Sequence, residues 1–372
     1  MKQTPIRIKV DLTNNPYEVV IGKNLLKQIG NELLALGFKQ STKILIVSNP
    51  VVAKEYASQL IQNLHLAGFT AKLLVLEAGE SQKNIKSIGY IHDSSYEQKL
   101  ERNSLMIALG GGVVGDMTGF AAATWLRGIP FVQIPTTLLA MVDASVGGKT
   151  GVNHPKGKNL IGAFHQPKLV LIDPVTLKTL PDREFRAGIA EVIKYGVIGD
   201  KKLFELLENA KDIKNLNSID KELIIEILYR SVKSKAKIVE QDERESGLRA
   251  ILNYGHTFGH VIETLEGYGV WIHGEAVSIG MIVAGELAIK KNLWTIEDNQ
   301  RQKELLLKAG LPIHWPKLNI TKVLETLTTD KKVKDGNIKF ILPKSIGKVI
   351  IDDIDNEEIK KFIYNLNQDS NC

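Results

Sequence analysis

The sequence has almost no cysteine, and this limits both its redox chemistry and its metal chemistry. Its 372 residues contain one cysteine, Cys372, which is the last residue. An internal disulfide needs two cysteines and a thiolate-rich zinc cluster needs several, so both are excluded. Any metal that the chain binds must therefore be held by nitrogen and oxygen ligands.

Long apolar runs are also missing. No apolar segment approaches the ~20 residues that a membrane-spanning helix requires. The first four residues lead directly into an alternating strand pattern, without the apolar core of a secretory signal peptide. We therefore expect a cytoplasmic protein.

The sequence has no concentrated block of basic residues, although its formal net charge is +6 and its pI is about 9.0. Lysines are scattered among aspartates and glutamates, which argues against a nucleic-acid partner. A small anionic substrate accounts for the same excess. With 44% hydrophobic and 24% charged residues, the chain has an average globular composition, and its length fits about two domains of roughly 150 residues.

The first half of the chain alternates strand-like and helix-like segments. Short apolar, β-branched runs lie at residues 6–10, 17–21, 43–47, 71–76, 104–109, 131–134 and 169–172. Amphipathic stretches such as residues 52–66 separate the early runs, which gives a βαβ order. The pattern predicts an α/β domain over residues 1–181, with a parallel sheet covered by helices.

The second half has a different periodicity. From about Asp182 onward, the apolar residues recur at the 3.6-residue period of helices. Helical patterns cover residues 184–197, 202–209, 221–240, 251–266, 274–291 and 297–308. We expect residues 182–372 to form a mainly α-helical second domain, with one strand-like segment at 339–343.

A glycine-rich turn follows the strand-like run 104–109. It contains glycines at 110, 111, 112 and 115, and a helical pattern follows over residues 117–125. Glycines in this context let backbone N–H groups approach a phosphate, and the helix dipole favours the anion. The spacing fits G-x-G-x-x-G, but it follows the third strand and not the first. On these residues alone, dinucleotide binding and a merely tight turn are equal alternatives.

Residues 143–159 form a second glycine-rich region. Its lysines, threonines and asparagines can donate hydrogen bonds to oxyanions, and we expect it to be a loop that is free to form a site. A flexible basic loop without a ligand is the alternative. Residues 147–150 resemble the end of a P-loop, but Asp143 stands where the first glycine is needed, so ATP hydrolysis is not expected.

Three of the eight histidines lie between residues 256 and 273. His256 and His260 are four residues apart and share a face if the segment is helical. Neutral imidazole is the commonest protein ligand for divalent transition metals. Gly255 and Gly259 are poor helix formers, which suggests that something approaches this backbone closely. Two core or capping histidines are the alternative interpretation.

Glu191 is a candidate carboxylate ligand. Its apolar neighbours leave little polar face on the helix, and a buried carboxylate is costly unless it is paired or bound to a metal. Lys194, three residues later, is an alternative partner. Together with His273 near the start of the next helix, two or three histidines and one carboxylate predict an open tetrahedral zinc site.

Together these motifs resemble the 3-dehydroquinate synthases of the sugar phosphate cyclase family. The matching motifs run in order over most of the chain, at residues 109–116, 133–137, 143–153, 191–194, 248–253, 255–260 and 273–276. The resemblance implies an α/β N-terminal Rossmann-like nucleotide-binding domain with an all-α C-terminal metal-binding domain, in a homodimer. It implies NAD and a divalent metal, Zn or Co, as cofactors.

The resemblance also implies a reaction. In that family, a lyase of the shikimate pathway converts 3-deoxy-D-arabino-heptulosonate 7-phosphate to 3-dehydroquinate and phosphate. NAD takes a hydride and returns it, so the cofactor is regenerated in each cycle. The pathway leads to chorismate and the aromatic amino acids.

Specific residues follow from the same resemblance. The implied metal ligands are Glu191, His256 and His273. The implied catalytic residues are His260, Lys194, Asp143 and Asn253. The implied NAD contacts are Asn49, Ala78, Gly79, Glu80, Ser81, Gln82, Lys83, Gly112, Val113, Val114, Gly115, Asp116, Thr136, Thr137, Lys149, Lys158, Thr176, Leu177, Lys178 and Thr179. The implied substrate contacts are Arg127, Asp143, Lys149, Lys158, Asn159, Lys194, Lys235, Arg249, Asn253, His260 and Lys332.

Each implied role suits its residue type. Lys149, Asn159 and Arg127 would hold the phosphate by charge-assisted hydrogen bonds, with Arg127 reaching the site of the partner subunit. Arg249 suits bidentate binding of the substrate carboxylate. Asn49 departs from the aspartate of some relatives.

Three other functions are compatible with parts of the pattern. Another sugar phosphate cyclase, such as 2-deoxy-scyllo-inosose synthase, would act on a substrate without a carboxylate, whereas Arg249 and Lys235 favour one. A metal-dependent polyol dehydrogenase would accumulate NADH. A nucleotide-binding regulator without catalysis would have no need for all three metal ligands.

Overall fold

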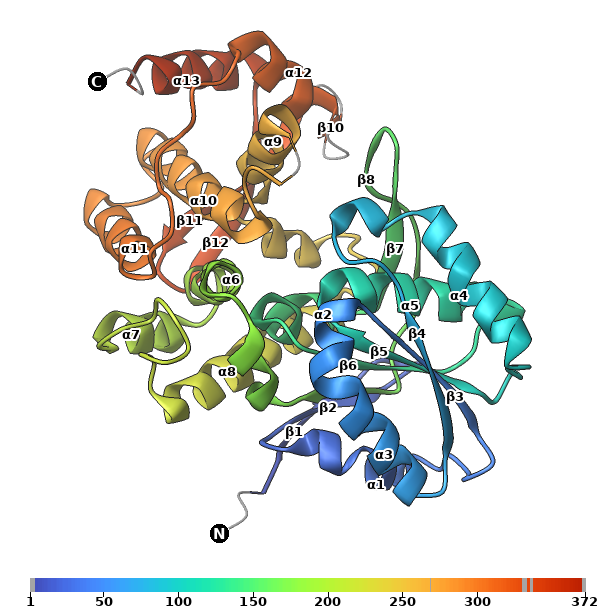
Figure 1. Ribbon diagram of the computed structural model, residues 1–372. Helices are drawn as coiled ribbons and strands as arrows, with labels where there is room; N and C mark the ends of the chain where they lie inside the picture. Colours follow the sequence, from blue (N-terminus) through green and yellow to red (C-terminus); the bar gives the residue numbers. More distant parts are fainter. Residues whose placement is uncertain (1–3, 268, 330–332, 335–336, 370–372) are drawn as a thin grey trace. The chain divides into compact units, whose positions relative to one another are not determined.

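The computed structural model describes residues 4–267, 269–329, 333–334 and 337–369 (Figure 1). The chain divides into two compact units, one made of residues 1–180 with 224–244 and the other of residues 181–223 with 245–372. The sequence placed all of 182–372 in the helical domain, so the assignment of 224–244 requires a correction.

Tertiary contacts explain why this segment belongs to the first unit. It forms most of helix α8 (Lys221–Gln241). The Lys235 ammonium forms an ion pair with the Asp143 carboxylate, and the Glu240 carboxylate accepts a hydrogen bond from the Asp11 N–H at 2.8 Å. Helical periodicity reveals the helix but not the partners of its polar face.

The first unit is built on a seven-stranded sheet of order β1-β2-β9-β6-β5-β3-β4. All neighbouring strands are parallel except β1, which pairs antiparallel with β2. The predicted parallel α/β organisation is confirmed. The strands are β1 (Ile6–Val10), β2 (Tyr17–Ile21), β3 (Lys43–Ser48), β4 (Thr70–Val75), β5 (Leu105–Gly110), β6 (Phe131–Pro135) and β9 (Leu169–Ile172).

Helices cover both faces of this sheet. Successive side chains of β3 point to opposite faces and pack against different helices. Ile44 and Ile46 pack in a core with α1 (Ile29–Ala35) and α3 (Ser58–Leu66). Leu45 and Val47 point to the other face and pack with α4 (Ile85–Glu97) and α5 (Gly112–Thr124). Because both faces are buried in the middle of the sheet, inner strands such as β5 and β9 are continuously apolar, whereas the edge strand β1 alternates. Short helices α2 (Pro50–Val52) and η2 (Ala53–Ala57) lead into α3.

The strand order explains why the glycine-rich turn follows the third strand. β3 pairs with β4 on one side and with β5 on the other, so the chain changes direction in the sheet between β4 and β5. In open α/β sheets, ligands bind at the carboxyl ends of strands beside such a switch point. Asn49 follows β3 and Gly111 follows β5, which places both at this edge.

The region expected to be a loop forms a two-stranded hairpin, so that expectation was wrong for most of it. β7 (Lys149–His154) pairs antiparallel with β8 (Gly157–Phe164). A Cβ on Gly151 would lie 2.4 Å from the Ile161 carbonyl oxygen, and one on Gly162 would lie 2.2 Å from that of Thr150. The glycines therefore allow close approach of two strands instead of flexibility.

The second unit is mainly helical, as predicted, but the all-α description needs a correction. An antiparallel sheet of order β10-β11-β12 joins the helices, and it includes the strand expected at 339–343. The helices are α6 (Asp182–Ile198), α7 (Lys201–Asn209), α9 (His256–Glu266), α10 (His273–Lys290), α11 (Ile296–Lys308), α12 (Ile320–Thr329) and α13 (Asn356–Asp369), and the strands are β10 (Val333–Lys334), β11 (Asn337–Ser345) and β12 (Lys348–Ile354).

Burial explains the extra sheet. Ile338, Phe340, Ile341 and Leu342 of β11 are buried, so this strand contributes apolar side chains to the interior of the unit. Within the described residues, no helix is long and apolar enough to span a bilayer.

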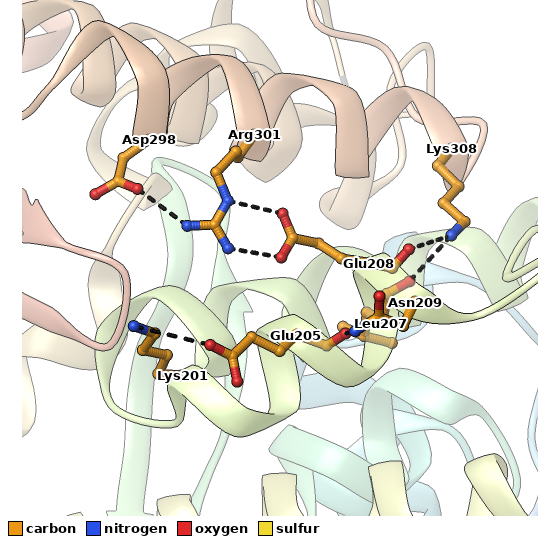
Figure 2. Close-up of polar contacts among 8 residues, drawn as sticks. All are labelled: Lys201, Glu205, Leu207, Glu208, Asn209, Asp298, Arg301 and Lys308. Carbon is orange, nitrogen blue, oxygen red and sulfur yellow. Dashed lines mark hydrogen bonds and ion pairs between the residues drawn. The ribbon is translucent and has the colours of Figure 1, made fainter.

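Polar contacts join α7 to α11 in the second unit (Figure 2). The Arg301 guanidinium donates to both carboxylate oxygens of Glu208, at 3.0 and 2.7 Å. The Lys308 ammonium donates to the carbonyl oxygens of Leu207 and Glu208 at the end of α7. Partly exposed ion pairs contribute only about 0–1 kcal/mol. They join α7 to α11, the helix that carries Gln302 of the site described below.

Candidate metal centre and nucleotide-binding edge

Three helices of the second unit bring Glu191, His256 and His273 together. The Nε2 atoms of His256 and His273 each lie 3.6 Å from Glu191 Oε1. The potential ligand atoms of the three residues all lie within 4.8 Å of one another. Two ligand atoms bound tetrahedrally to zinc at about 2.1 Å are about 3.4 Å apart. The arrangement therefore fits a small divalent cation.

The two oxygens of the Glu191 carboxylate have different surroundings. The residue is fully buried, and Oε2 forms an ion pair with Lys194, which is itself buried. Neither oxygen accepts a hydrogen bond from the described residues, and Oε1 is the oxygen that faces the two histidines. An unsatisfied buried acceptor costs about 1–3 kcal/mol, and a cation beside Oε1 would offset this cost. Metal binding and pairing with Lys194 are thus compatible, one at each oxygen.

Each histidine of the trio also has a partner behind it. His256 Nδ1 lies 3.1 Å from the Tyr254 carbonyl oxygen, which can only accept, so Nδ1 carries the proton and Nε2 is free to ligate. The Tyr254 hydroxyl donates to Gln302 of α11 at 2.8 Å. His273 Nδ1 lies 3.5 Å from Glu263 Oε2. Such partners orient metal-binding imidazoles and raise their basicity.

The two imidazoles differ in their affinity for protons. Burial and the Lys194 charge hold the pKa of His256 well below its usual value. Burial also acts to lower the pKa of His273, but the carboxylates of Glu191 and Glu263 outweigh it and raise this pKa to about 10. A pKa of about 10 means that His273 favours the protonated form at neutral pH when no metal is bound.

Metal affinity should consequently depend on pH. Because the proton on His273 must leave before the nitrogen can ligate, we expect affinity to rise about tenfold per pH unit below pH 10. Titration calorimetry of the metal-free protein with zinc, in buffers of different ionisation enthalpy, should show the release of about one proton per ion. Zinc binding without proton release would contradict the assignment of His273 as a ligand.

His260 lies beside the trio without belonging to it. Its ring centroid is 5.6 Å from that of His256 and 6.4 Å from that of His273. The helical spacing alone favoured His256 and His260 as a pair. The structure groups His256 with His273 instead. Residues 248–253 form a 3₁₀ helix, and α9 begins only at His256, after Gly255 with its positive φ of 78°.

The other substrate residues predicted in the second unit lie on or near the 3₁₀ helix η7 (Leu248–Asn253). Arg249 is 1% exposed, and the Asn253 amide donates to Glu245 at 3.1 Å. Lys332 lies outside the described residues, so its assignment stays a prediction. Glu263, Tyr254 and Gln302 support the histidines from behind, and motif matching did not identify them as functional.

At the edge of the sheet in the first unit, glycines let α5 begin directly after β5. A Cβ on Gly110 would lie 2.8 Å from Val114, and one on Gly115 would lie 2.6 Å from the Gln133 amide oxygen. Among the residues predicted to bind NAD, Gly112, Val113, Val114, Gly115 and Asp116 form the first turn and a half of α5. This helix N-terminus suits an anionic phosphate.

The remaining residues predicted to bind NAD have different local roles. Asn49 Oδ1 accepts a hydrogen bond from the Val52 N–H at 3.0 Å and so caps α2. The Thr176 hydroxyl donates to the Asp173 carbonyl, and the Thr179 hydroxyl lies 2.7 Å from that of Tyr56. Thr136 is buried, and its hydroxyl has no hydrogen-bond partner in the described part of the chain. Thr137 accepts from the Ala140 N–H. Leu177 is buried and Lys178 is exposed.

Several charged residues predicted for NAD or substrate contact one another in the first unit. The buried Lys83 ammonium lies 2.5 Å from both Asp116 Oδ2 and Asn159 Oδ1. The Lys235 ammonium pairs with the Asp143 carboxylate and donates to its carbonyl oxygen at 2.8 Å. These contacts hold the ammonium groups of Lys83 and Lys235 in fixed positions.

Arg127 lies in an unusual backbone segment. The φ angles of Leu126, Arg127 and Gly128 are 48°, 68° and 119°, so three consecutive residues adopt the left-handed region. Non-glycine residues there cost about 1 kcal/mol or more each, and such strain is typical of functional segments. Arg127 is exposed.

Family comparisons agree with this geometry. Residues 73–187 match the family model described as 3-dehydroquinate synthase N-terminal, and residues 188–333 match 3-dehydroquinate synthase C-terminal. A 3-dehydroquinate synthase of Prochlorococcus marinus is 64% identical over 364 residues, covering 98% of this chain and 99% of the relative.

Solved structures with the same fold include two other cyclases. 2-Epi-5-epi-valiolone synthase from Streptomyces hygroscopicus subsp. jinggangensis 5008, with NAD⁺ and Zn²⁺ bound, has a TM-score of 0.86 and 31% identity, covering 96% of this chain and 99% of its own. 2-Deoxy-scyllo-inosose synthase complexed with carbaglucose-6-phosphate, NAD⁺ and Co²⁺ has a TM-score of 0.86 and 24% identity, covering 97% of this chain and 100% of its own. At that identity the second likeness establishes the fold alone.

Proposed function

The chain belongs to the 3-dehydroquinate synthase family, and on this premise we propose that it converts 3-deoxy-D-arabino-heptulosonate 7-phosphate to 3-dehydroquinate and phosphate. The nearly full-length match to proteins with that name carries the proposal. The reaction belongs to the shikimate pathway, which supplies chorismate for aromatic amino acids. We propose NAD and Zn²⁺ or Co²⁺ as cofactors, as the family resemblance implies, and the valiolone synthase relative at 31% identity holds NAD⁺ and Zn²⁺.

In this proposal Glu191, His256 and His273 hold the metal. When bound, NAD would supply a reversible hydride acceptor and the metal a Lewis acid beside the substrate hydroxyls. Lys194 compensates the charge of Glu191 Oε2, because the two groups are paired and buried. His260 would take a proton from a substrate hydroxyl, and its position next to the trio but outside it supports this role.

The proposed substrate contacts divide by the group that they bind. Lys149, Asn159 and Arg127 bind the phosphate through charge-assisted hydrogen bonds. The guanidinium of Arg249 is planar, so it can bind the carboxylate in a bidentate manner. That contact favours the heptulosonate over substrates of other cyclases that lack a carboxylate.

One assay tests the proposal against its alternatives. The metal-loaded protein should release phosphate from the heptulosonate in the presence of NAD, without a lasting rise of NADH absorbance. Turnover of glucose 6-phosphate but not the heptulosonate would indicate a 2-deoxy-scyllo-inosose synthase. Net NADH accumulation with a polyol would indicate a dehydrogenase.

We also propose that the protein acts in the cytoplasm as a homodimer, with Arg127 completing the phosphate site of the partner subunit. The exposure of Arg127 and its constrained backbone support this assignment. Arg127→Ala and His273→Ala should each be inactive alone. If the subunits exchange freely, an equal mixture should recover about a quarter of wild-type activity, because half of the dimers are mixed and each has one complete site.

Steady-state rates of the mixture, after incubation long enough for subunit exchange, measure this recovery. Sedimentation velocity gives the oligomeric state of each variant. If Arg127 acted within its own subunit, the mixture would stay inactive. Fractionation of the native cells tests the location.

A further inference from the structure

Asn153 makes three hydrogen bonds to residues around the proposed NAD and phosphate sites. Its Nδ2 donates to Glu80 Oε1 at 2.8 Å, and its Oδ1 accepts from the Asn159 N–H at 2.9 Å. Its backbone N–H donates to the Lys83 carbonyl oxygen at 2.8 Å. Asn153 was not among the site residues predicted from the sequence, although all three of its partners were.

The backbone contact lies beside an irregularity in the hairpin. The β7–β8 register shifts between Val152 and His154, so Asn153 has no partner in the ladder. Its N–H bonds to Lys83, in the segment that follows η3 (Glu80–Gln82). Irregularities of this kind commonly redirect side chains beside active sites.

The contacts form a closed network. Asn159 has a positive φ of 52°, a conformation that asparagine tolerates better than most residues. Its Oδ1 accepts from the Lys83 ammonium, which also meets Asp116 at the start of α5. Moving Asn153 would thus disturb Glu80 and Lys83 on one side and Asn159 on the other.

We propose that Asn153 is a positioning residue, which fixes the NAD-binding segment 80–83 and the phosphate-binding residue Asn159 relative to each other. This inference rests on the proposed function, because that function assigns NAD to the segment and phosphate to Asn159. A carboxamide suits the position, since one side chain must both donate to a carboxylate and accept from an N–H.

The donor and acceptor pattern permits a specific test by a double-mutant cycle. Asn153→Asp keeps the acceptor for Asn159 but sets two carboxylates against each other at Glu80. Glu80→Gln supplies an amide that can donate to the introduced carboxylate, so the hydrogen bond is restored with its direction reversed. Asn153→Ala removes both side-chain bonds and tests the contact without adding charge.

We expect Asn153→Asp to raise the dissociation constant of NAD about tenfold or more in the wild-type background, which corresponds to about 1.4 kcal/mol. In the Glu80→Gln background, Asn153→Asp should raise the dissociation constant of NAD only about threefold or less. The difference between the two backgrounds is a coupling energy within the 0.5–3 kcal/mol range found for residues in contact. Asn153→Ala should weaken NAD binding and raise the KM of the heptulosonate together.

NAD binding is measured by calorimetry on the metal-loaded protein, with phosphate release for KM and kcat. Retained zinc and the midpoint temperature of thermal unfolding report whether each variant is folded. If Asn153→Asp fails to fold, the NAD affinity of Asn153→Ala tests the positioning role. Equal losses in both backgrounds, or wild-type NAD affinity in Asn153→Ala, would overturn the positioning role. Absence of NAD binding and turnover in the wild type would instead overturn the proposed function on which this role rests.

Discussion

Replacing His273 by alanine should abolish both metal retention and turnover. The change removes one of three nitrogen or oxygen atoms that lie within 4.8 Å of one another, and it leaves two ligands for a cation that normally takes three from the protein. Loss of a supporting contact behind a ligand already costs about 10–100-fold in metal affinity, so loss of the ligand itself should cost more than about 100-fold. Metal analysis after dialysis against a chelator, followed by zinc or cobalt add-back, measures the effect.

Two matched variants separate ligation from other roles. His260→Ala should retain the metal while losing turnover, because His260 lies beside the trio and not in it. Glu263→Gln should weaken metal binding by about 10–100-fold, because Glu263 lies behind His273 Nδ1 and is not itself one of the three ligands. Wild-type metal content in purified His273→Ala would show that the ligand set is wrong.

The sequence predicted the sheet well, for a physical reason. Inner strands such as β9 are buried on both faces and continuously apolar, whereas the edge strand β1 alternates between apolar and charged residues. Both patterns are visible in the sequence, and residues 6–10, 17–21 and 169–172 were located at their observed bounds. The hairpin of β7 and β8 was missed because its glycines, such as Gly151 and Gly162, resemble those of a flexible loop. A glycine can give a loop flexibility or allow two backbone segments to pack closely. Which of these applies depends on the segment that faces the glycine in the fold, and a single sequence does not show that segment.

The metal site shows a similar limit. Spacing along one helix identified His256 and His260, since it detects only residues on the same helix. The structure groups His256 with Glu191 and His273, which lie on α6 and α10, so their proximity depends on the packing of three helices. Resemblance to a family supplied that information. It did not supply Tyr254 and Gln302, whose contribution is visible only in their contacts.

Gly280→Ala should destabilise the second unit strongly, although alanine is the better helix former. A Cβ at Gly280 would lie 1.9 Å from the Gly255 carbonyl oxygen, so the backbones of α9 and α10 are in direct contact there. Backbone cannot yield as a flexible side chain can, and overpacking of this kind typically costs about 1–3 kcal/mol and occasionally more. The gain of up to about 1 kcal/mol in helix propensity is too small to compensate.

The same substitution should reduce metal affinity, because the two helices carry two of the ligands. Gly255 immediately precedes His256, and α10 begins at His273, so a shift of either helix separates the two Nε2 atoms. Gly274 has a related role toward α6, since its Cβ would lie 2.1 Å from the Ala187 carbonyl oxygen. These glycines explain how three helices approach closely enough for the trio to form.

Gly89→Ala in α4 is the matched control. It is also a glycine inside a helix, but no atom lies within 4 Å of its added Cβ. It should therefore leave metal affinity unchanged and stabilise its own unit by up to about 1 kcal/mol. Thermal unfolding of the metal-free variants gives stability, and zinc titration gives affinity. If Gly280→Ala behaved like Gly89→Ala in both, close contact between α9 and α10 would not be what holds His256 and His273 in place.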